Sequence, residues 1–143
     1  MKYKRTFIKN VDKGLRAPHN LLQIIIGPRQ VGKTTAALQI KDDWQGKTLY
    51  ASADDPLPPG PEWIQHHWQM ARREKPGSTL LILDEVQKVR GWSEVVKAMW
   101  DEDKQKGSSC KVLLLGSSSL LIQKGLSESL SGRFMLHPFT HWS

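Results

Sequence analysis

Hydrophobic and polar positions divide this chain into two kinds of segment. Five short stretches are mostly apolar, as expected for strands that are covered on both faces of a sheet. These stretches are residues 21–26, 48–51, 79–83, 111–115 and, as a shorter candidate, 134–136. Gly, Pro and polar residues bound each stretch, and the stretches are shorter than a typical buried helix. The pattern predicts a sheet of four or five short strands.

Between the strands, apolar residues recur at intervals of three and four, which is the spacing of one helix face. In the segment 33–44 this spacing is formed by Ala36, Ala37, Ile40 and Trp44. A second helix is predicted from Pro61, a residue that suits the first turn, to about residue 75, and a third over 92–106. Strands that alternate with helices of this length indicate a parallel sheet between two helical layers. The predicted fold class is therefore a three-layer α/β domain.

The composition is that of an ordinary globular protein. Of 143 residues, 38% are hydrophobic and 24% are charged, which allows a packed core and excludes general disorder. The single cysteine, Cys110, excludes a disulfide framework and favours a reducing compartment. No apolar run approaches the roughly 20 residues of a membrane span, and no apolar secretory segment is visible near the N-terminus. We therefore expect a cytoplasmic protein with no membrane partner.

The net charge of +7 is concentrated near the N-terminus. Residues 1–20 contain six basic residues and one acidic residue, so they carry +5, and residues 21–143 carry the remaining +2. We interpret residues 1–20 as a basic leader, solvated as a helix or an arm, that precedes a nearly neutral domain over 21–143. The leader leaves a nucleic-acid partner open, although no motif in the sequence is of the kind that reads bases.

A glycine-rich segment after the first strand carries the strongest chemical signal. Residues 27–34, GPRQVGKT, match the pattern G-x-x-x-x-G-K-[ST] of the phosphate-binding loop, between a predicted strand and a predicted helix. Glycines permit close approach of the backbone, whose N–H groups then surround a phosphate together with the helix N-terminus. Lys33 is expected to reach the β- and γ-phosphates, and Thr34 to bind Mg²⁺. The expected nucleotide-binding residues are Gly27, Pro28, Arg29, Gln30, Val31, Gly32, Lys33, Thr34 and Thr35.

An acidic pair ends the strand over 79–83. Asp84 and Glu85 stand at the position of the second element of a nucleoside triphosphatase. Asp84 is expected to hold Mg²⁺ through water, and Glu85 to orient and deprotonate the attacking water. A dedicated base favours hydrolysis, and the absence of an Asn-Lys-x-Asp guanine-reading motif from the sequence favours ATP.

The strand over 111–115 also ends in polar residues. Gly116 and the serines that follow it place a hydroxyl group where it would report the γ-phosphate or position water, or they form an ordinary Ser-rich turn. Further along, residues 130–132 read Leu-Ser-Gly, as in the signature of ABC transporters. That signature precedes the acidic strand, whereas this one follows it, so the order of the motifs excludes the transporter interpretation.

Taken together, these motifs resemble a known family. GPRQVGKTT, LLILDEVQK, LLLGSSSLL and ESLSGRF occur in the order and spacing of prokaryotic AAA+ ATPases in which this domain precedes a C-terminal domain of unknown function. The resemblance covers about residues 21–143. It implies a P-loop NTPase core of the ASCE/AAA+ type with the strand order 5-1-4-3-2. AAA+ modules continue into a small helical lid, so we interpret this sequence as an N-terminal fragment that stops before the lid.

The same resemblance assigns two further residues by matching motifs. Ser117, or alternatively Ser118, falls at the sensor-1 position, and Arg133 falls at the position of the arginine finger. Such a finger acts on the γ-phosphate of a neighbouring subunit, so it implies a homo-oligomer. The alternative interpretation of Arg133, from the residues alone, is a surface turn beside Gly132.

The sequence thus predicts Mg²⁺-dependent binding and hydrolysis of ATP that drives a conformational change in a partner domain or subunit. One alternative is a binding module in which the nucleotide controls contact with nucleic acid or protein with little turnover; the basic leader motivates it. A further alternative is a small-molecule kinase, although the sequence contains no segment that resembles a mobile, Arg-rich lid over an acceptor site.

Overall fold

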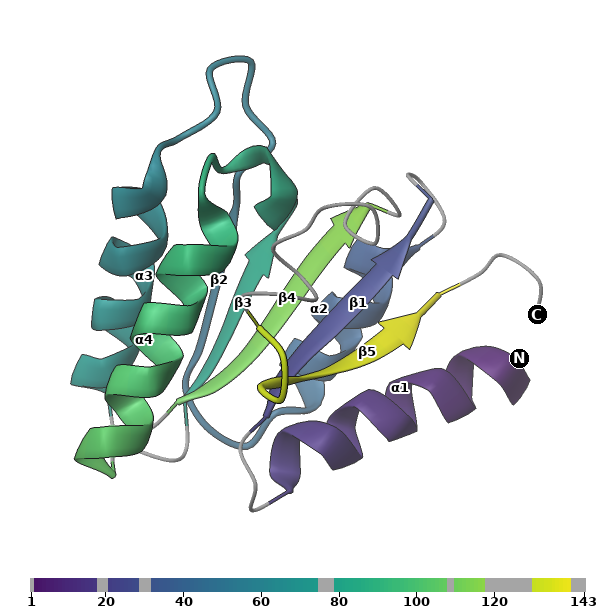
Figure 1. Cartoon of the computed structure of the whole chain (residues 1–143). Helices are drawn as coiled ribbons and strands as arrows, with labels where there is room; N and C mark the ends of the chain where they lie inside the picture. Colours follow the sequence, from purple (N-terminus) through teal and green to yellow (C-terminus); the bar gives the residue numbers. More distant parts are fainter. Residues whose placement is uncertain are drawn as a thin grey trace.

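A computed structural model describes residues 2–17, 21–28, 32–74, 79–107, 110–117 and 130–139. Within these residues, five strands form one parallel sheet in the order β2-β3-β4-β1-β5 (Figure 1). The strands are β1 (Leu22–Gly27), β2 (Thr48–Ser52), β3 (Leu80–Asp84), β4 (Lys111–Ser117) and β5 (Phe134–Pro138). Read from the other edge, this is the order 5-1-4-3-2, so the predicted topology is confirmed.

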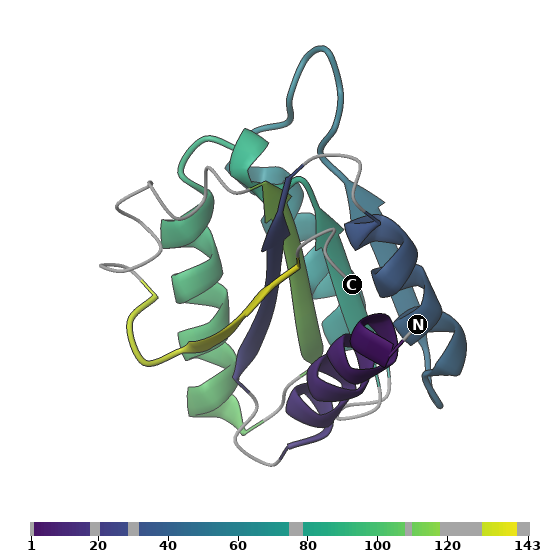
Figure 2. The ribbon, with the colours of Figure 1, turned by 90° about the vertical axis from the view of Figure 1, so that its right-hand side faces the viewer.

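Helices cover both faces of the sheet, which confirms the predicted three layers (Figure 2). One face is covered by α3 (Pro61–Arg73) and α4 (Trp92–Lys106), and the other by α1 (Lys2–Arg16) and α2 (Lys33–Asp43). A short 3₁₀-helix, η1 (Val86–Lys88), follows β3 and was not predicted. It turns the chain aside directly after the acidic pair.

The central strands are buried on both faces because successive side chains of a strand point to opposite sides. In β1, Ile24 and Ile26 pack with α3 and α4, whereas Ile25 packs with α1 and α2. Every residue of β1 and β3 is buried. Burial on both faces explains why these two strands read as nearly continuous apolar runs rather than as alternating ones.

The N-terminal helix differs from the expectation of a solvated leader. Phe7, Val11 and Leu15 of α1 are spaced four residues apart and are buried against α2 and the sheet. The opposite face of α1 is exposed and basic, through Arg5, Lys9, Lys13 and Arg16. The expectation of a solvated leader was wrong for the apolar face of α1. Its three apolar side chains follow a helical repeat, but they stand among basic residues that dominate the composition of the segment. Helix α1 is therefore part of the packed domain.

Candidate functional site

The chemical signals of the sequence meet at one edge of the sheet. In a parallel sheet the carboxyl ends of all strands lie at the same edge, where ligands bind in open α/β folds. Gly27 ends β1, Asp84 ends β3 and Ser117 ends β4, the strand between them. Gly27 and Ser117 lie opposite each other in the strand register. The fold thus brings the glycine-rich loop, the acidic pair and Ser117 together.

The two glycines of the loop are required for different reasons. Gly32 has a φ of 92°, a left-handed conformation that glycine adopts without strain, immediately before α2. A Cβ atom on Gly27 would lie 2.4 Å from the carbonyl oxygen of Phe139, so only glycine fits there. The Phe139 ring in turn lies 4.7 Å from the Phe7 ring between centroids, which links α1 to the loop. Residues 29–31, and with them the predicted contacts of Arg29, Gln30 and Val31, lie outside the described residues.

Lys33, the first residue of α2, directs its ammonium group toward this edge. Its side chain is only 4% exposed. The Nζ atom donates a hydrogen bond to the carbonyl oxygen of Gly27 at 3.3 Å and lies 4.0 Å from Oε2 of Glu85. Charge-assisted hydrogen bonds are typically about 2.7–2.9 Å long, so both contacts are loose. The ammonium group is positioned between the loop and the acidic pair without being tightly held by either. Thr34 and Thr35 follow it in the first turn of α2 and are exposed.

Asp84 is the centre of the site. It is 4% exposed, and its Oδ2 atom accepts hydrogen bonds from the Thr34 hydroxyl at 3.0 Å and the Tyr50 hydroxyl at 2.5 Å. Burial, and next the hydrogen bond to Asp84, raise the pKa of Tyr50 above its usual range, so the phenol keeps the proton that it donates. No sequence motif assigns a role to Tyr50. Its proximity depends on the register that places Tyr50 opposite Ile82, two residues before Asp84.

The other carboxylate oxygen of Asp84 tests whether the site fits a metal ion. Within the described part of the chain, Oδ1 is buried and has no hydrogen-bond partner, an arrangement that is costly unless something binds that oxygen. Carboxylate and hydroxyl oxygens are the ligands that Mg²⁺ prefers, often one or two carboxylates together with substrate phosphates. No cluster of three or more His, Cys, Asp or Glu side chains suited to a metal occurs among those same residues. Asp84 and Thr34 therefore fit a Mg²⁺ ion that is shared with phosphate rather than an all-protein metal site.

Glu85 occupies an unusual backbone conformation. Its φ of 55° and ψ of 41° are left-handed, and it is the only non-glycine residue with a positive φ in the described ranges. This turn aims the side chain back at the site, where Oε2 faces Lys33 and Oε1 accepts a hydrogen bond from Nε2 of Gln87 at 2.8 Å. Left-handed backbone costs a non-glycine residue of the order of 1–2 kcal/mol and is concentrated at functional sites.

Ser117, the candidate sensor, is half-buried at the end of β4. Its backbone N–H donates to Oε1 of Gln87 at 3.4 Å, so Gln87 lies between Ser117 and Glu85. Gln87 is part of the sequence motif LLILDEVQK, but the motif assigns it no role, and its only signal is its position two residues after Glu85. Ser118, the alternative sensor, lies outside the described residues.

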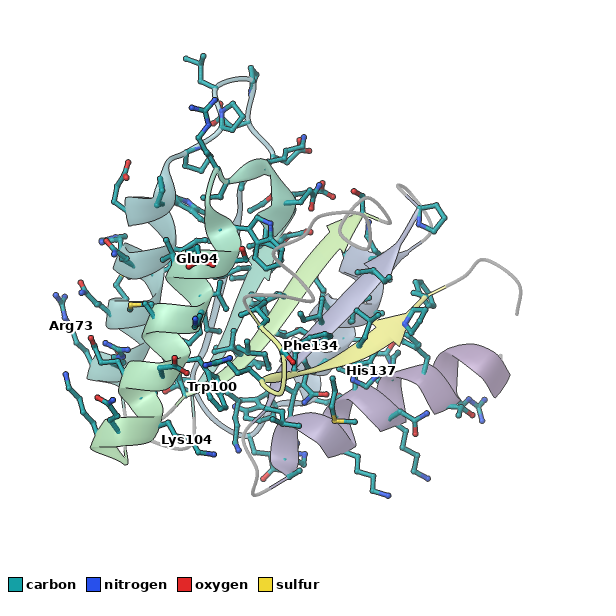
Figure 3. All side chains as sticks on the ribbon, viewed as in Figure 1. Arg73, Glu94, Trp100, Lys104, Phe134 and His137 are labelled. Atoms are coloured by element: carbon teal, nitrogen blue, oxygen red, sulfur yellow. The ribbon has the colours of Figure 1, made fainter. Side chains whose placement is uncertain are left out.

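Arg133 lies at the amino-terminal end of the strands, whereas the rest of the predicted site lies at their carboxyl end. Its carbonyl oxygen accepts a hydrogen bond from the N–H of Leu22, the first residue of β1. Its guanidinium group donates to both carboxylate oxygens of Asp101 on α4, at 2.8 and 3.2 Å, and lies 5.8 Å from the Trp100 ring. Figure 3 labels Trp100 on α4 and Phe134, the neighbour of Arg133, on β5. Since six strand residues span about 20 Å, Arg133 is a full strand length from the loop of its own chain.

Comparison with protein families agrees with this fold. A family model described as an AAA domain matches residues 19–142. The chain belongs to the AAA domain family. Membership agrees with the five-stranded parallel sheet, which is that of a P-loop NTPase core, and supports binding of a nucleotide by this domain. The match begins after α1, which ends at Arg16.

No curated protein matches the chain. Among the described helices, none combines the length and apolar character needed to cross a membrane.

Proposed function

We propose that this AAA domain binds ATP together with Mg²⁺ and hydrolyses it, and that hydrolysis drives a conformational change in a partner domain or subunit. The observation that carries the proposal is the hydrogen bond of 3.0 Å between Thr34 and Asp84, which are 50 residues apart in sequence. It joins the phosphate-binding loop to the acidic strand at the point where a shared Mg²⁺ ion would lie. Lys33 and Glu85 flank this point.

Each residue of the site has a role that follows from its chemistry. The loop backbone and the N-terminus of α2 bind phosphate oxygens through their N–H groups, and the buried Lys33 ammonium adds a positive charge. Thr34 and Asp84 hold Mg²⁺, which when bound neutralises charge on the phosphates. Glu85 accepts a proton from the attacking water. Ser117, at the end of β4, acts as the sensor of the γ-phosphate. Gly27, Pro28 and Thr35, with residues 29–31, complete the loop.

Removal of the Lys33 charge tests nucleotide binding. Lys33→Ala should weaken binding of ATP·Mg²⁺ by roughly 10- to 100-fold, because it deletes charge-assisted hydrogen bonds to phosphate. Lys41→Ala removes the same charge from the last turn of the same helix and serves as the matched control. Affinity is measured by isothermal titration calorimetry with and without Mg²⁺. Equal affinities for Lys33→Ala and Lys41→Ala would contradict the assigned site.

For Arg133 we propose a role in trans, as the arginine finger of a homo-oligomer. Its distance from the loop of its own chain supports a site on a neighbouring subunit, and its half-buried pair with Asp101 must open for that contact. Subunits with Arg133→Ala keep a normal nucleotide site, and subunits with Glu85→Gln keep a normal finger. A mixture of the two should therefore regain turnover, which a phosphate-release assay measures. A mixture that stays as inactive as its components would exclude the trans role.

A second candidate function is control of nucleic-acid binding by the nucleotide. Arg5, Lys9, Lys13 and Arg16 form one exposed stripe along α1. If the stripe contacts a phosphate backbone, log K should fall by roughly 0.9 per neutralised phosphate for each tenfold increase in salt. Fluorescence anisotropy with labelled duplex DNA measures this slope. A binding constant that does not change with salt would exclude this candidate.

We also propose a cytoplasmic location, supported by the state of Cys110. This residue is a buried free thiol, and burial raises its pKa to about 12. A thiol that stays protonated and enclosed has no role in disulfide exchange, which agrees with a reducing compartment. Cell fractionation with a tagged chain tests the location, and recovery outside the cytoplasm would contradict it.

A further inference from the structure

Gln87 connects the two polar residues that end neighbouring strands at the candidate site. It lies in η1, half-buried, two residues after Glu85. Its Nε2 atom donates a hydrogen bond to Oε1 of Glu85 at 2.8 Å, and its Oε1 atom accepts one from the backbone N–H of Ser117 at 3.4 Å. One amide group therefore touches both the expected base and the end of the expected sensor strand.

The chemistry of these two contacts requires an amide. The Ser117 N–H is a donor and needs an acceptor, whereas the ionised Glu85 carboxylate is only an acceptor and needs a donor. The amide of glutamine offers one of each in a fixed plane. The contacts also fix the orientation of the amide, because a flipped Gln87 would place its NH₂ group against the Ser117 N–H and its oxygen against the carboxylate.

The sheet explains why a side chain is needed at this place. The pairing of β3 with β4 ends with Leu83 opposite Leu114, but β4 continues for three more residues to Ser117. The left-handed turn at Glu85 directs the chain away from the sheet, and η1 follows. The Gln87 side chain continues the contact with β4 beyond the last backbone pair.

The Glu85 carboxylate is consequently held from two sides. Its Oε2 atom faces Lys33 at 4.0 Å, which is a loose contact, and its Oε1 atom is bound by Gln87 at 2.8 Å. The Lys33 ammonium is expected to engage phosphate when nucleotide binds, and Gln87 then remains as the group that fixes the carboxylate. A base must be held within a fraction of an ångström of its productive geometry to act efficiently.

We propose that Gln87 is a positioning residue: it fixes the rotamer of Glu85 and ties it to Ser117, so that the base and the end of β4 move together. The proposal rests on the proposed ATP hydrolysis for its effect on turnover. Its structural part, the ordering of Glu85 by Gln87, does not depend on turnover. Gln87 has no direct role in binding ATP.

Two substitutions of Gln87 distinguish the hydrogen bond that it donates to Glu85 from the one that it accepts from Ser117. Gln87→Met has a similar length and removes both the donor and the acceptor, whereas Gln87→Glu keeps an acceptor for Ser117 and replaces the donor with a second carboxylate beside Glu85. Gln69→Met, at an exposed position of α3, is the matched control. All variants are made in the full chain.

The first readout is NMR of the protein without nucleotide. Side-chain carbon relaxation of Glu85 should show greater mobility in both Gln87 variants and no change in Gln69→Met. Amide exchange at Ser117 should become roughly tenfold faster in Gln87→Met and remain within about twofold of wild type in Gln87→Glu, which retains the acceptor. An equally ordered Glu85 side chain in wild type and Gln87→Met would overturn the proposal, whether or not the protein hydrolyses ATP.

The second readout is the division of the effect between binding and turnover. In Gln87→Met, the affinity for ATP·Mg²⁺ should remain within about twofold of wild type, while single-turnover hydrolysis falls by roughly ten- to a hundredfold. Gln87→Glu should be at least as slow, although it preserves the contact with Ser117. Unchanged turnover in an active protein would overturn the proposal for Gln87 alone. A wild-type chain that never cleaves ATP, but in which the variants loosen Glu85, would count against the proposed function and support the positioning contact.

Discussion

Two buried aspartates of this domain stand in opposite situations. Asp103 on α4 is 3% exposed, and each of its carboxylate oxygens has a donor: Trp68 Nε1 at 2.8 Å and Arg72 Nε at 2.6 Å. Asp84 is 4% exposed, but both of its donors share one oxygen, and the described residues leave the other oxygen without a partner. The two residues have the same type and nearly the same burial, and they differ in whether the protein completes their hydrogen bonds.

We infer that the difference separates a structural carboxylate from a candidate functional one. Asp103 belongs to a network in which Arg72 also donates to Glu102 and to the carbonyl oxygen of Met99, so it connects α3 to α4. A satisfied network stabilises a single packing arrangement, whereas an unsatisfied buried oxygen is a cost that a ligand can remove. Under the proposed function, Asp84 has an oxygen left to bind a cation, and Asp103 does not.

Replacement of each aspartate by asparagine should give the largest difference in the free energy of unfolding. Asp103→Asn should lower the free energy of unfolding by about 2–4 kcal/mol, because the amide offers one acceptor oxygen where Asp103 has two, so either Trp68 Nε1 or Arg72 Nε would face its NH₂ group. Asp84→Asn should change it by less than about 1 kcal/mol, since it removes a buried charge that lacks full compensation. Urea denaturation measures both values. Similar losses for the two variants would remove the distinction.

Removal of one hydrogen-bond donor from each aspartate should change the free energy of unfolding by a smaller amount. Trp68→Phe deletes the indole N–H that binds Asp103, and Tyr50→Phe deletes the hydroxyl that binds Asp84. We expect Trp68→Phe to lower the free energy of unfolding by about 1–3 kcal/mol, because an oxygen of Asp103 loses its partner in the core. Tyr50→Phe should cost less, since Thr34 still donates to the same oxygen. Thermal unfolding of the two variants compares them, and the reverse order would contradict this account.

The smallest expected effect concerns pH. His137 on β5 is hydrogen-bonded to Gln23 Oε1 at 2.7 Å, and burial lowers the pKa of the imidazole. A lowered pKa means that the unfolded chain binds the proton more readily, so stability falls as pH drops below about 6.5. The slope for one such group is at most about 1.4 kcal/mol per pH unit. Urea midpoints at pH 7, 6 and 5 measure it, and His137→Gln should reduce the slope; an unchanged slope would show that His137 does not cause it.

The sequence predicted those parts of the molecule in which a local pattern, either a continuous apolar run or a motif of fixed spacing, determines the structure. The central strands were recognisable because each of their side chains is buried on one face or the other. The loop and the acidic pair were recognisable as candidates because they match the motif spacing expected of a P-loop ATPase. Charge composition concealed α1, since its three buried side chains stand among exposed basic residues.

The remaining features depend on register and on turns that no local pattern specifies. Tyr50 reaches Asp84 only because β2 pairs with β3 in one register. Gln87 reaches Glu85 and Ser117 only because the chain turns left-handed at Glu85. The partner of Arg133, Asp101, lies 32 residues away on another element. The sequence therefore located the candidate site but missed the residues that support it.

The most direct test of the central claim uses Glu85→Gln. This substitution keeps the size of the side chain and removes the group that accepts a proton from water. If the site hydrolyses ATP, the variant should bind ATP·Mg²⁺ about as tightly as wild type and lose roughly 10²- to 10⁴-fold in single-turnover cleavage. Cleavage by Glu85→Gln at the wild-type rate would contradict the account.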